Sequence, residues 1–423
     1  MSKVLYVVPH GADLGGIITA SENYMAGFKE ASHTATFITV SFSKTNRGVG
    51  GEPRGKYERE FTRGVGTGEL MHPTQGWRGE RRISICTPEG VKEFIKLANA
   101  HDVVVWASMF GFRNEATEGT TLWLDAIRKH KAGNVFMIHD DHMPKRYLWA
   151  ASLGKYAAAF VGVQPCSLES TVGVASPRAM VYTAIPTPPG RVTPMEMRAG
   201  FMSIQVWKQW KRADALVRAV PHMPKGKVFF AGDGIALRYM RSETKCPDKF
   251  KDEKGVPIWT TAMKKAHYMG VLDETMRDAH FRASKFLVDL SVRQNSGQLN
   301  RVVQEAMAQG CVVIANPRFL TGTTPNPIFV PGRDYLPIDT NLEPRKLADV
   351  LGEYDHIDAT AYAKIQRSAR AKLGLFNRAH AAEDLVQLGL GKIAGAACYP
   401  AEPDKDMIKR ATEEFVAIFG AKP

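Results

Sequence analysis

The chain has 423 residues, of which 44% are hydrophobic; at about 100–200 residues per domain, this composition fits two or three domains with buried cores. Charged residues make up 23%, a globular value that excludes a wholly disordered chain. The formal net charge of +13 favours a polyanionic partner (nucleic acid, an anionic membrane or a nucleotide), although many basic proteins bind none of these.

The cysteines and the apolar runs indicate the cellular compartment and whether the chain enters a membrane. The five cysteines are far apart and form no CxxC pair, which argues against a disulfide framework or a zinc site and favours a reducing cytosol. The apolar run at 4–8 is too short for a signal peptide, and no later stretch reaches the roughly 18 apolar residues that a membrane helix needs. We therefore expect a cytoplasmic monomer without a membrane partner and with no firmly implied metal.

The first half of the chain alternates strands and helices. Strands are predicted at 3–8, 35–42, 102–107, 134–138 and 159–163, with helical stretches between most of them. Such alternation predicts a parallel sheet covered by helices on both faces. Gly15 and Gly16 lie between the first strand and a helix at 17–30, where backbone N–H groups can approach a diphosphate; the pair also marks ordinary tight turns.

A basic, glycine-rich segment at 43–82 interrupts this alternation. It contains nine lysines and arginines, with Tyr57, Phe61 and Trp77 interleaved. Spaced cations and aromatic rings suit phosphate contacts and base stacking, whereas a solvated surface loop is the alternative. The residues of this segment expected to contact DNA are Arg47, Arg54, Arg59 and Arg63.

Four titratable residues directly follow the predicted strand at 134–138. They are His139, Asp140, Asp141 and His142. At the carboxyl end of a strand such side chains can hydrogen-bond sugar hydroxyls, act as a base or bind a metal, whereas an aspartate that caps the next helix is the alternative. Lys145 and Arg146 lie just beyond and are expected to contact DNA phosphates.

A proline-rich segment at 183–194 is typical of a linker, and a second α/β series follows it. Strands are predicted at 201–204, 227–231, 266–269, 285–290, 311–315 and 328–330. Helices are predicted at 208–220, 274–282, 299–309, 343–353, 358–374 and 404–419. Two Rossmann-like halves that face each other across a cleft would bind ligands beyond the carboxyl ends of their strands.

The second half opens with the segment WKQWKR at 207–212. Its Lys208 and Lys211 lie near the predicted start of a helix, where the helix dipole disfavours cations. A phosphate ligand would explain them, and a position on the surface is the alternative. The GDG sequence at 232–234 is typical of a sharp strand-to-helix turn.

A second candidate for nucleotide binding is the segment NSGQLN at 295–300. It opens a helix whose N-terminus offers free N–H groups near Gly297 and Gln298 to phosphate or ribose. Glu305 on this helix could accept both hydroxyls of a ribose, whereas a surface glutamate is the alternative.

The segment EAMAQGCVVIANP at 305–317 resembles the EAMAxGxPVIAS signature of retaining GT-B glycosyltransferases of the glycogen-synthase-like type. The glycine pair with its helix, the GDG turn and the run YMGVLDETMRDAHFRASKFLVDLS at 268–291 resemble the same family in the same order. Within that class the chain is similar to phage DNA α-glucosyltransferases, through HDDH at 139–142, Trp210-Lys211 and the place of the basic insertion. The resemblance covers 1–316.

The resemblance implies an α/β protein of GT-B architecture. Its acceptor domain would be 1–188 with the insertion 43–82, its nucleotide-sugar domain 189–400, and 401–423 would hold a C-terminal helix that returns to the first domain. The implied donor is a UDP-sugar, UDP-glucose first, and the implied acceptor is duplex DNA with a hydroxylated pyrimidine, in the host cytoplasm if a phage encodes the protein.

The resemblance also implies roles for single residues. Lys211, Lys208 and the amides near the glycines would stabilise the leaving diphosphate, and Glu305 would hold the ribose. His139, Asp140, Asp141 and His142 would position the sugar and the acceptor hydroxyl. The glycines concerned are Gly15, Gly16 and Gly297.

Two positions depart from the class. Gly297 stands where the class has a second glutamate for the sugar hydroxyls, and Gln298, Ser296 or backbone amides would have to replace it. Val206 stands where the class has an arginine, and Lys208 or Arg212 could supply the charge. The alternatives are a GT-B enzyme that acts on a glycan, lipid or small molecule, and a non-catalytic DNA-binding protein on a GT-B scaffold.

Overall fold

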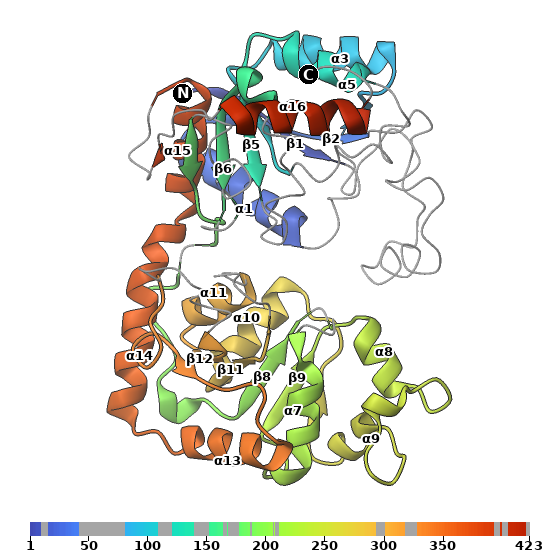
Figure 1. Cartoon of the computed structure of the whole chain (residues 1–423). Coiled ribbons are helices and arrows are strands. Elements are labelled where there is room, and N and C mark those ends of the chain that lie inside the picture. The colour runs from blue at the N-terminus through green and yellow to red at the C-terminus, as the bar shows by residue number, and fades with distance from the viewer. Residues whose placement is uncertain are drawn as a thin grey trace. The chain divides into compact units, whose positions relative to one another are not determined.

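The computed structural model divides the chain into two compact units, Met1–Ile185 with Phe376–Pro423 and Pro186–Leu375 (Figure 1). It describes residues 1–9, 16–41, 81–108, 121–138, 152–163, 167, 177–186, 188–205, 207, 211–292, 301–317, 328–392, 398–399 and 405–419. The boundary after Ile185 falls inside the proline-rich segment 183–194.

Eight described strands form the sheet of the first unit, in the order β14-β7-β6-β5-β4-β1-β2-β3. They are β1 (Lys3–Pro9), β2 (Thr34–Ser41), β3 (Arg81–Ser84), β4 (Val103–Trp106), β5 (Gly133–Ile138), β6 (Ala157–Gly162), β7 (Arg178–Met180) and β14 (Cys398–Tyr399). All neighbours pair in parallel except β14 with β7. The strands β3, β7 and β14, which were not predicted, have at most four residues, too few to show a pattern.

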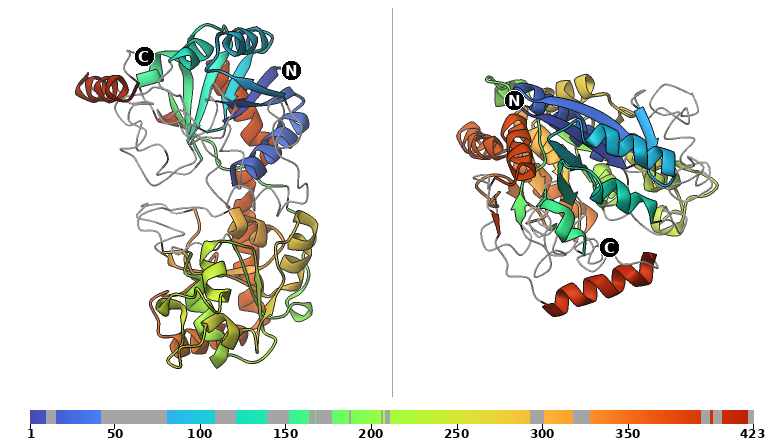
Figure 2. Two further views of the ribbon diagram at one scale, coloured as in Figure 1. Left: turned by 90° about the vertical axis from the view of Figure 1, so that its right-hand side faces the viewer. Right: turned by 90° about the horizontal axis from the view of Figure 1, so that it is seen from above.

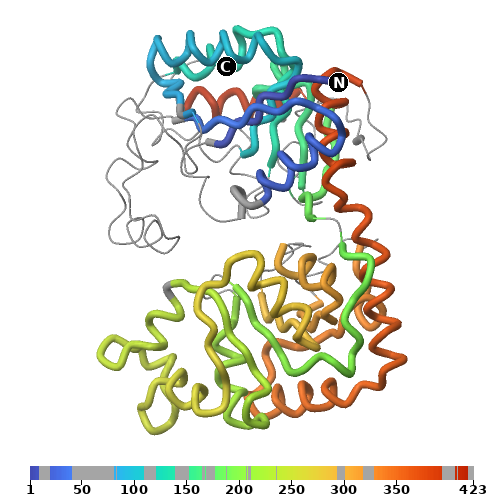
Figure 3. Tube along the Cα trace, turned by 180° about the vertical axis from the view of Figure 1, so that it is seen from behind, coloured from blue at the N-terminus to red at the C-terminus, as the bar shows by residue number. Residues whose placement is uncertain are grey.

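Helices α1 (Gly16–Glu30) and α15 (Arg378–Gly389) cover one face of this sheet (Figure 2, Figure 3). Tyr6 of β1 packs there with Tyr24 and Phe28 of α1. The backbones approach so closely that a side chain at Gly27 would lie 2.1 Å from the carbonyl oxygen of Arg378. This packing draws α15 into the first unit, so the predicted boundary at residue 400 is wrong and the second unit ends at Leu375.

The opposite face carries α3 (Pro88–Ala98), α5 (Leu122–Arg128) and α16 (Lys405–Phe419). Leu5 and Val7 of β1 point to this face because successive side chains of a strand alternate. Phe415 of α16 is fully buried with its ring centroid 6.0 Å from that of Trp123. The predicted return of the C-terminal helix to the first domain is thereby confirmed. Within the described ranges, no helix is long and apolar enough to cross a membrane.

The second unit has a sheet in the order β10-β9-β8-β11-β12-β13, and every pair is parallel. Its strands are β8 (Phe201–Ile204), β9 (Val228–Ala231), β10 (His267–Tyr268), β11 (Phe286–Asp289), β12 (Val312–Ala315) and β13 (Leu336–Pro337). Its helices are α7 (Ala213–Ala219), α8 (Ile235–Arg241), α9 (Ile258–Ala262), α10 (Glu274–Ala283), α11 (Arg301–Ala308), α13 (Pro344–Asp355) and α14 (Ala359–Lys372). In each sheet the first strand lies inside, with the next two strands on one side and the following ones on the other, which is the Rossmann order.

The strand predicted at 328–330 is wrong. The N–H of Val330 donates to the side chain of Asp334 at 2.7 Å, and the N–H of Asp334 donates back to the carbonyl oxygen of Val330. A turn therefore occupies this stretch, and the edge strand β13 begins later, at Leu336.

Arg198 ties α10 and α11 together. Its side chain is buried and donates to the carbonyl oxygens of Phe281 and Ser284 after α10, and of Gln309 after α11, at 2.6–3.0 Å. Gly310 follows with φ +85°, and a side chain there would lie 2.7 Å from the Arg198 guanidinium. The glycine of the EAMAQG segment is thus required both for its conformation and for this close approach.

Candidate active site

The candidate donor residues of the second unit follow two adjacent strands. Strands β8 and β11 pair in parallel, and the strand order reverses between them: β9 lies on the far side of β8, and β12 lies on the far side of β11. Open α/β sheets bind ligands beyond the strand ends at this switch point. Lys211 comes after β8, and Glu305 comes after β11, so both predicted donor contacts flank it.

The segment after β8 is anchored by Trp207. Its ring is fully buried, its indole N–H donates to the carbonyl oxygen of Ala231 at 3.0 Å, and its backbone N–H donates to that of Asp233 at 2.9 Å. These contacts fix the position of Trp207 after β8. Of the helix predicted at 208–220, α7 covers Ala213–Ala219, and 208–210 lie outside the described residues.

Lys211 lies directly before α7 and is buried, with 6% of its surface exposed. The next residue, Arg212, adopts the left-handed region with φ +50°, which is rare for a residue with a side chain. Such strain concentrates at functional sites, where the surrounding structure holds it in place. Arg212 in this conformation separates Lys211 from α7, which begins at Ala213.

The GDG turn packs against this segment. Side chains at Gly232 and Gly234 would lie 2.0 Å from the carbonyl oxygen of Gln205 and 2.5 Å from that of Trp207. Burial works against ionisation of Asp233, but hydrogen bonds from Arg238 and from the Gly234 N–H outweigh it and lower its pKa. The predicted turn is confirmed, and its glycines let the loops after β8 and β9 touch.

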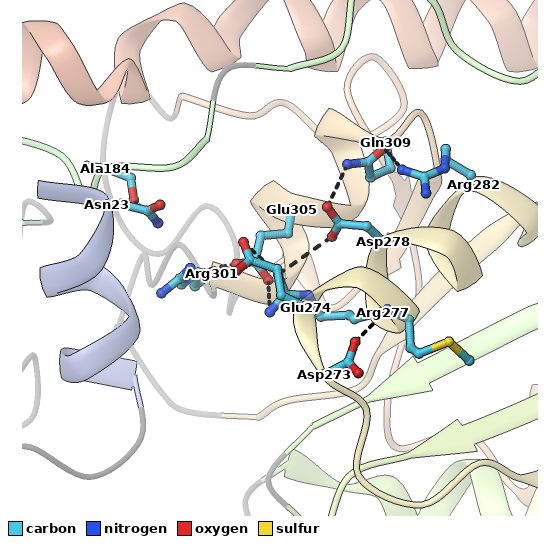
Figure 4. Close-up of polar contacts among 11 residues, drawn as sticks. Asn23, Ala184, Asp273, Glu274, Arg277, Asp278, Arg282, Arg301, Glu305 and Gln309 are labelled. Carbon is cyan, nitrogen blue, oxygen red and sulfur yellow. Dashed lines mark hydrogen bonds and ion pairs between the residues drawn. The ribbon is translucent and has the colours of Figure 1, made fainter. Parts of the chain in front are cut away.

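Glu305 lies on α11, and its side chain is 6% exposed (Figure 4). The interpretation of this residue as a surface glutamate is therefore wrong. Its two carboxylate oxygens are held separately: Arg301 Nε lies 2.6 Å from Oε1, and Arg277 Nη1 lies 3.3 Å from Oε2. Burial raises the pKa of Glu305, and the guanidinium groups of Arg301 and Arg277 oppose this rise.

Sequence reasoning missed both arginines. Arg301 stands four residues before Glu305 on the same helix, a spacing at which opposite charges pair. The sequence could therefore have predicted this ion pair. Arg277 belongs to α10 and has no local relation to Glu305 along the chain.

Many predicted site residues lie outside the described residues. Gly16 is described and is the first residue of α1. His139 follows the last residue of β5 in the sequence but lies outside the described residues. The predicted residues outside the described ranges are Gly15, Arg47, Arg54, Arg59, Arg63, His139, Asp140, Asp141, His142, Lys145, Arg146, Lys208, Gly297 and Gln298. In the part of the chain that the structure describes, no group of three or more His, Cys, Asp or Glu side chains could hold a metal ion.

No family model matches the chain, and no curated protein sequence matches it. Solved structures do. Anabaena HepE in complex with UDP-glucose is similar with a TM-score of 0.58 and 13% identity, over 92% of this chain and 99% of that one. An α-glucosyltransferase in complex with UDP and a 13-mer DNA containing an HMU base is similar with a TM-score of 0.59 and 10% identity, over 89% and 96%.

A third similar structure is Staphylococcus aureus TarM in complex with fondaparinux, α-GlcNAc-glycerol and UDP, with a TM-score of 0.57 and 12% identity over 92% of this chain and 99% of that one. Together with the two Rossmann-ordered sheets and the returning C-terminal helix, these likenesses show that the chain has the GT-B fold of glycosyltransferases. The predicted fold class is confirmed.

Proposed function

We propose that the chain is a glycosyltransferase that moves a sugar from a UDP-sugar to a hydroxylated pyrimidine base in DNA, with retention of configuration. The observation that carries the donor half is Glu305, a buried carboxylate on the helix that follows β11 at the switch point of the second sheet. A carboxylate has about four lone-pair sites, and each arginine uses one, so both oxygens keep capacity for the two hydroxyls of a ribose.

The chemical step requires stabilisation of a leaving diphosphate. The bond between the sugar C1 and the diphosphate oxygen breaks, a bond from C1 to the acceptor oxygen forms, and the acceptor proton passes to a carboxylate of Asp140 or Asp141. Lys211, at the switch point, supplies positive charge for the leaving group, with Lys208 and the amides near Gly16 and Gly297. His139 and His142 position the sugar and the acceptor.

The DNA half of the proposal rests on charge and on one similar structure. The net charge is +13, nine cations lie in the segment 43–82, and the similar α-glucosyltransferase was crystallised with DNA. A base in a duplex must be flipped out to reach an active site, at a cost of a few kcal/mol that contacts from this segment would offset. HepE and TarM make a glycan or small-molecule acceptor the competing outcome.

Binding of the donor nucleotide is tested by thermal unfolding. UDP at about a hundredfold excess over its Kd should stabilise the native protein by about 2.7 kcal/mol, because it binds the folded state only. Adenosine diphosphate at the same concentration is the control for unspecific anion binding. If neither UDP nor a UDP-sugar raises the melting temperature more than adenosine diphosphate does, the donor assignment is lost.

Binding of DNA is tested by its salt dependence. Each phosphate contact releases counterions, so log K should fall with log salt at about −0.9 per contact, and about five contacts give a slope near −4 to −5. Changing Arg54, Arg59 and Arg63 together to Ala should flatten the slope and weaken all sequences alike, because phosphate contacts carry no sequence information. UDP affinity should stay unchanged.

The acceptor itself is identified by mass spectrometry of nucleosides after incubation of modified DNA with a panel of sugar nucleotides. A sugar on a hydroxylated pyrimidine supports the proposal. Transfer to a small acceptor or glycan, but never to DNA, favours the competing acceptor class. UDP stabilisation without transfer to any acceptor favours a non-catalytic protein on a GT-B scaffold.

A further inference from the structure

The contacts of Glu305 point to residues that act through it. Its side chain is 6% exposed, and those of Arg301 and Arg277 are 15% and 16% exposed. Burial of an ionised carboxylate costs several kcal/mol unless it is paired and hydrogen-bonded. The two guanidinium groups provide that pairing from two different helices, one at each oxygen (Figure 4).

Among the described residues, Glu305 is the carboxylate that both arginines contact. Nη1 of Arg301, and Nε and Nη2 of Arg277, are buried there without a hydrogen-bond partner. Arg277 Nη2 lies 3.5 Å from Asp278 and 3.7 Å from Glu274, longer than its Nη1 contact to Glu305. The hydrogen-bonded contact of Arg301 is the 2.6 Å bond to Glu305, so the burial of Arg301 is offset mainly through this carboxylate, whereas Arg277 shares its charge among Glu305, Asp278 and Glu274.

Further contacts hold α10, which carries Arg277, against α11, which carries Glu305. Gln309 on the turn after α11 donates to Asp278 of α10 at 3.0 Å and accepts from Arg282 at 3.3 Å (Figure 4). Together with Arg198, which binds the C-terminal ends of both helices, these contacts fix α10 against α11. The guanidinium of Arg277 is therefore held at a set place relative to the Glu305 carboxylate.

We infer that Arg277 and Arg301 are positioning residues for Glu305, which keep its buried carboxylate ionised and oriented to accept the vicinal hydroxyls of a ribose. The ribose contact rests on the proposed function, whereas the ionisation does not. An anion is needed because a protonated carboxyl offers one donor and loses acceptor capacity, whereas a diol presents two O–H donors.

Other charged groups near Glu305 also contribute to the pH dependence of stability. From its own helix Arg301 faces it, and from α10 the facing groups are Arg277, Asp278 and Glu274. Asp289 of β11 accepts from Ser291, and Arg370 of α14 donates to the carbonyl oxygen of Ala308. The remaining ionisable groups on elements packed against α11 are His280 and Arg282 of α10 and Tyr362, Lys364, Arg367 and Lys372 of α14. The experiment must therefore cancel the contribution of these groups to the pH dependence of stability.

A double-mutant cycle on stability makes that comparison. Unfolding free energies of the wild-type protein, Arg277→Met, Glu305→Gln and the double variant are measured from about pH 5 to pH 8. Burial raises the pKa of Glu305 in the folded state, so the stability it contributes is present at low pH and is lost as pH rises through that pKa. Loss of Arg277 raises this pKa further, so the destabilisation by Arg277→Met should grow with pH.

In the Glu305→Gln background the same Arg277→Met change keeps only the pH dependence that comes from Asp278 and Glu274, which also contact Arg277. The difference between the two backgrounds, which is the coupling free energy, isolates Glu305 and should grow with pH. Arg301→Met in both backgrounds should repeat the pattern with a larger amplitude, since its contact is shorter. Arg282→Met, on the same helix but paired with Gln309, is the matched control and should show no such growth. A coupling that is absent, or equal at both ends of the pH range, overturns the inference.

UDP affinity provides the second readout. The terminal phosphate of UDP itself titrates at about pH 6, so each variant is compared with the wild-type protein at the same pH. Relative to the wild-type protein, Arg277→Met should lose affinity as pH falls, by up to about tenfold per pH unit below the pKa of its Glu305, because only the ionised fraction is competent. Arg277→Lys should restore most of the affinity at low pH, and Glu305→Gln should bind weakly at every pH. Loss of affinity in Arg277→Met that is equal at every pH contradicts the positioning role.

The two proposals fail separately. If the wild-type protein does not bind UDP or any other nucleoside diphosphate, the proposed function falls, but the stability cycle still decides whether the arginines hold Glu305 ionised. If UDP binds and the cycle shows no pH-dependent coupling, the donor assignment stands and the positioning role falls.

Discussion

We expect the Lys211→Met variant to transfer sugar about 100 to 1,000 times more slowly than the wild-type protein and to keep its fold. Loss of one preorganised donor that faces developing negative charge costs about 2.7–4 kcal/mol of transition-state stabilisation. Lys211 follows β8, one of the two strands that border the switch point, and it is buried directly before the left-handed Arg212, so water competes little with its charge. Methionine keeps the aliphatic stem, so packing is retained while the charge is removed.

Steady-state kinetics with saturating donor measure this loss. It should appear in kcat more than in KM, since the charge on the diphosphate grows in the transition state. Lys225→Met, at an exposed position of the same unit, is the matched control and should be near wild type. A Lys211→Met enzyme with near-normal kcat would show that the charge comes from elsewhere, with Lys208 the first candidate.

The second large effect is on stability. Arg198→Met should lower the free energy of unfolding by about 3–5 kcal/mol, because buried backbone carbonyls at the ends of α10 and α11 lose a charged donor. The carbonyl oxygens concerned belong to Thr193, Phe281, Ser284 and Gln309. Since these contacts fix α10 against α11, UDP affinity should fall as well, through Glu305.

Urea unfolding of the two variants Arg198→Met and Arg191→Met tests this prediction. Arg191 is exposed and serves as the control, with an expected change within about 0.5 kcal/mol. A loss below about 1 kcal/mol for Arg198→Met would mean that water or neighbouring donors replace the guanidinium and that α10 and α11 are held by their apolar contacts.

Local patterns in the sequence were sufficient for the elements that build the site. The apolar runs at 201–204 and 285–290 predict β8 and β11, and EAMAQGCVVIA predicts a helix, a glycine turn and a buried strand. These features depend on residues within one or two turns of each other, so periodicity and the φ preference of glycine suffice. Because strand order follows Rossmann rules, the switch point beside Lys211 and Glu305 also follows from the alternation of elements.

Contacts between residues far apart in the sequence could be seen only in the tertiary structure. The pairing of Arg277 with Glu305 and the contacts of Arg198 with the carbonyl oxygens of Phe281, Ser284 and Gln309 link residues far apart in the sequence and have no periodic signature. The end of the second unit at Leu375 depends on α15 packing against α1, through the close approach at Gly27. Sequence by itself thus determined the GT-B fold and the place of Glu305, whereas only the packing of α10 on α11 decided that two arginines hold its carboxylate, since burial and charge pairing arise from contacts that form in the folded chain.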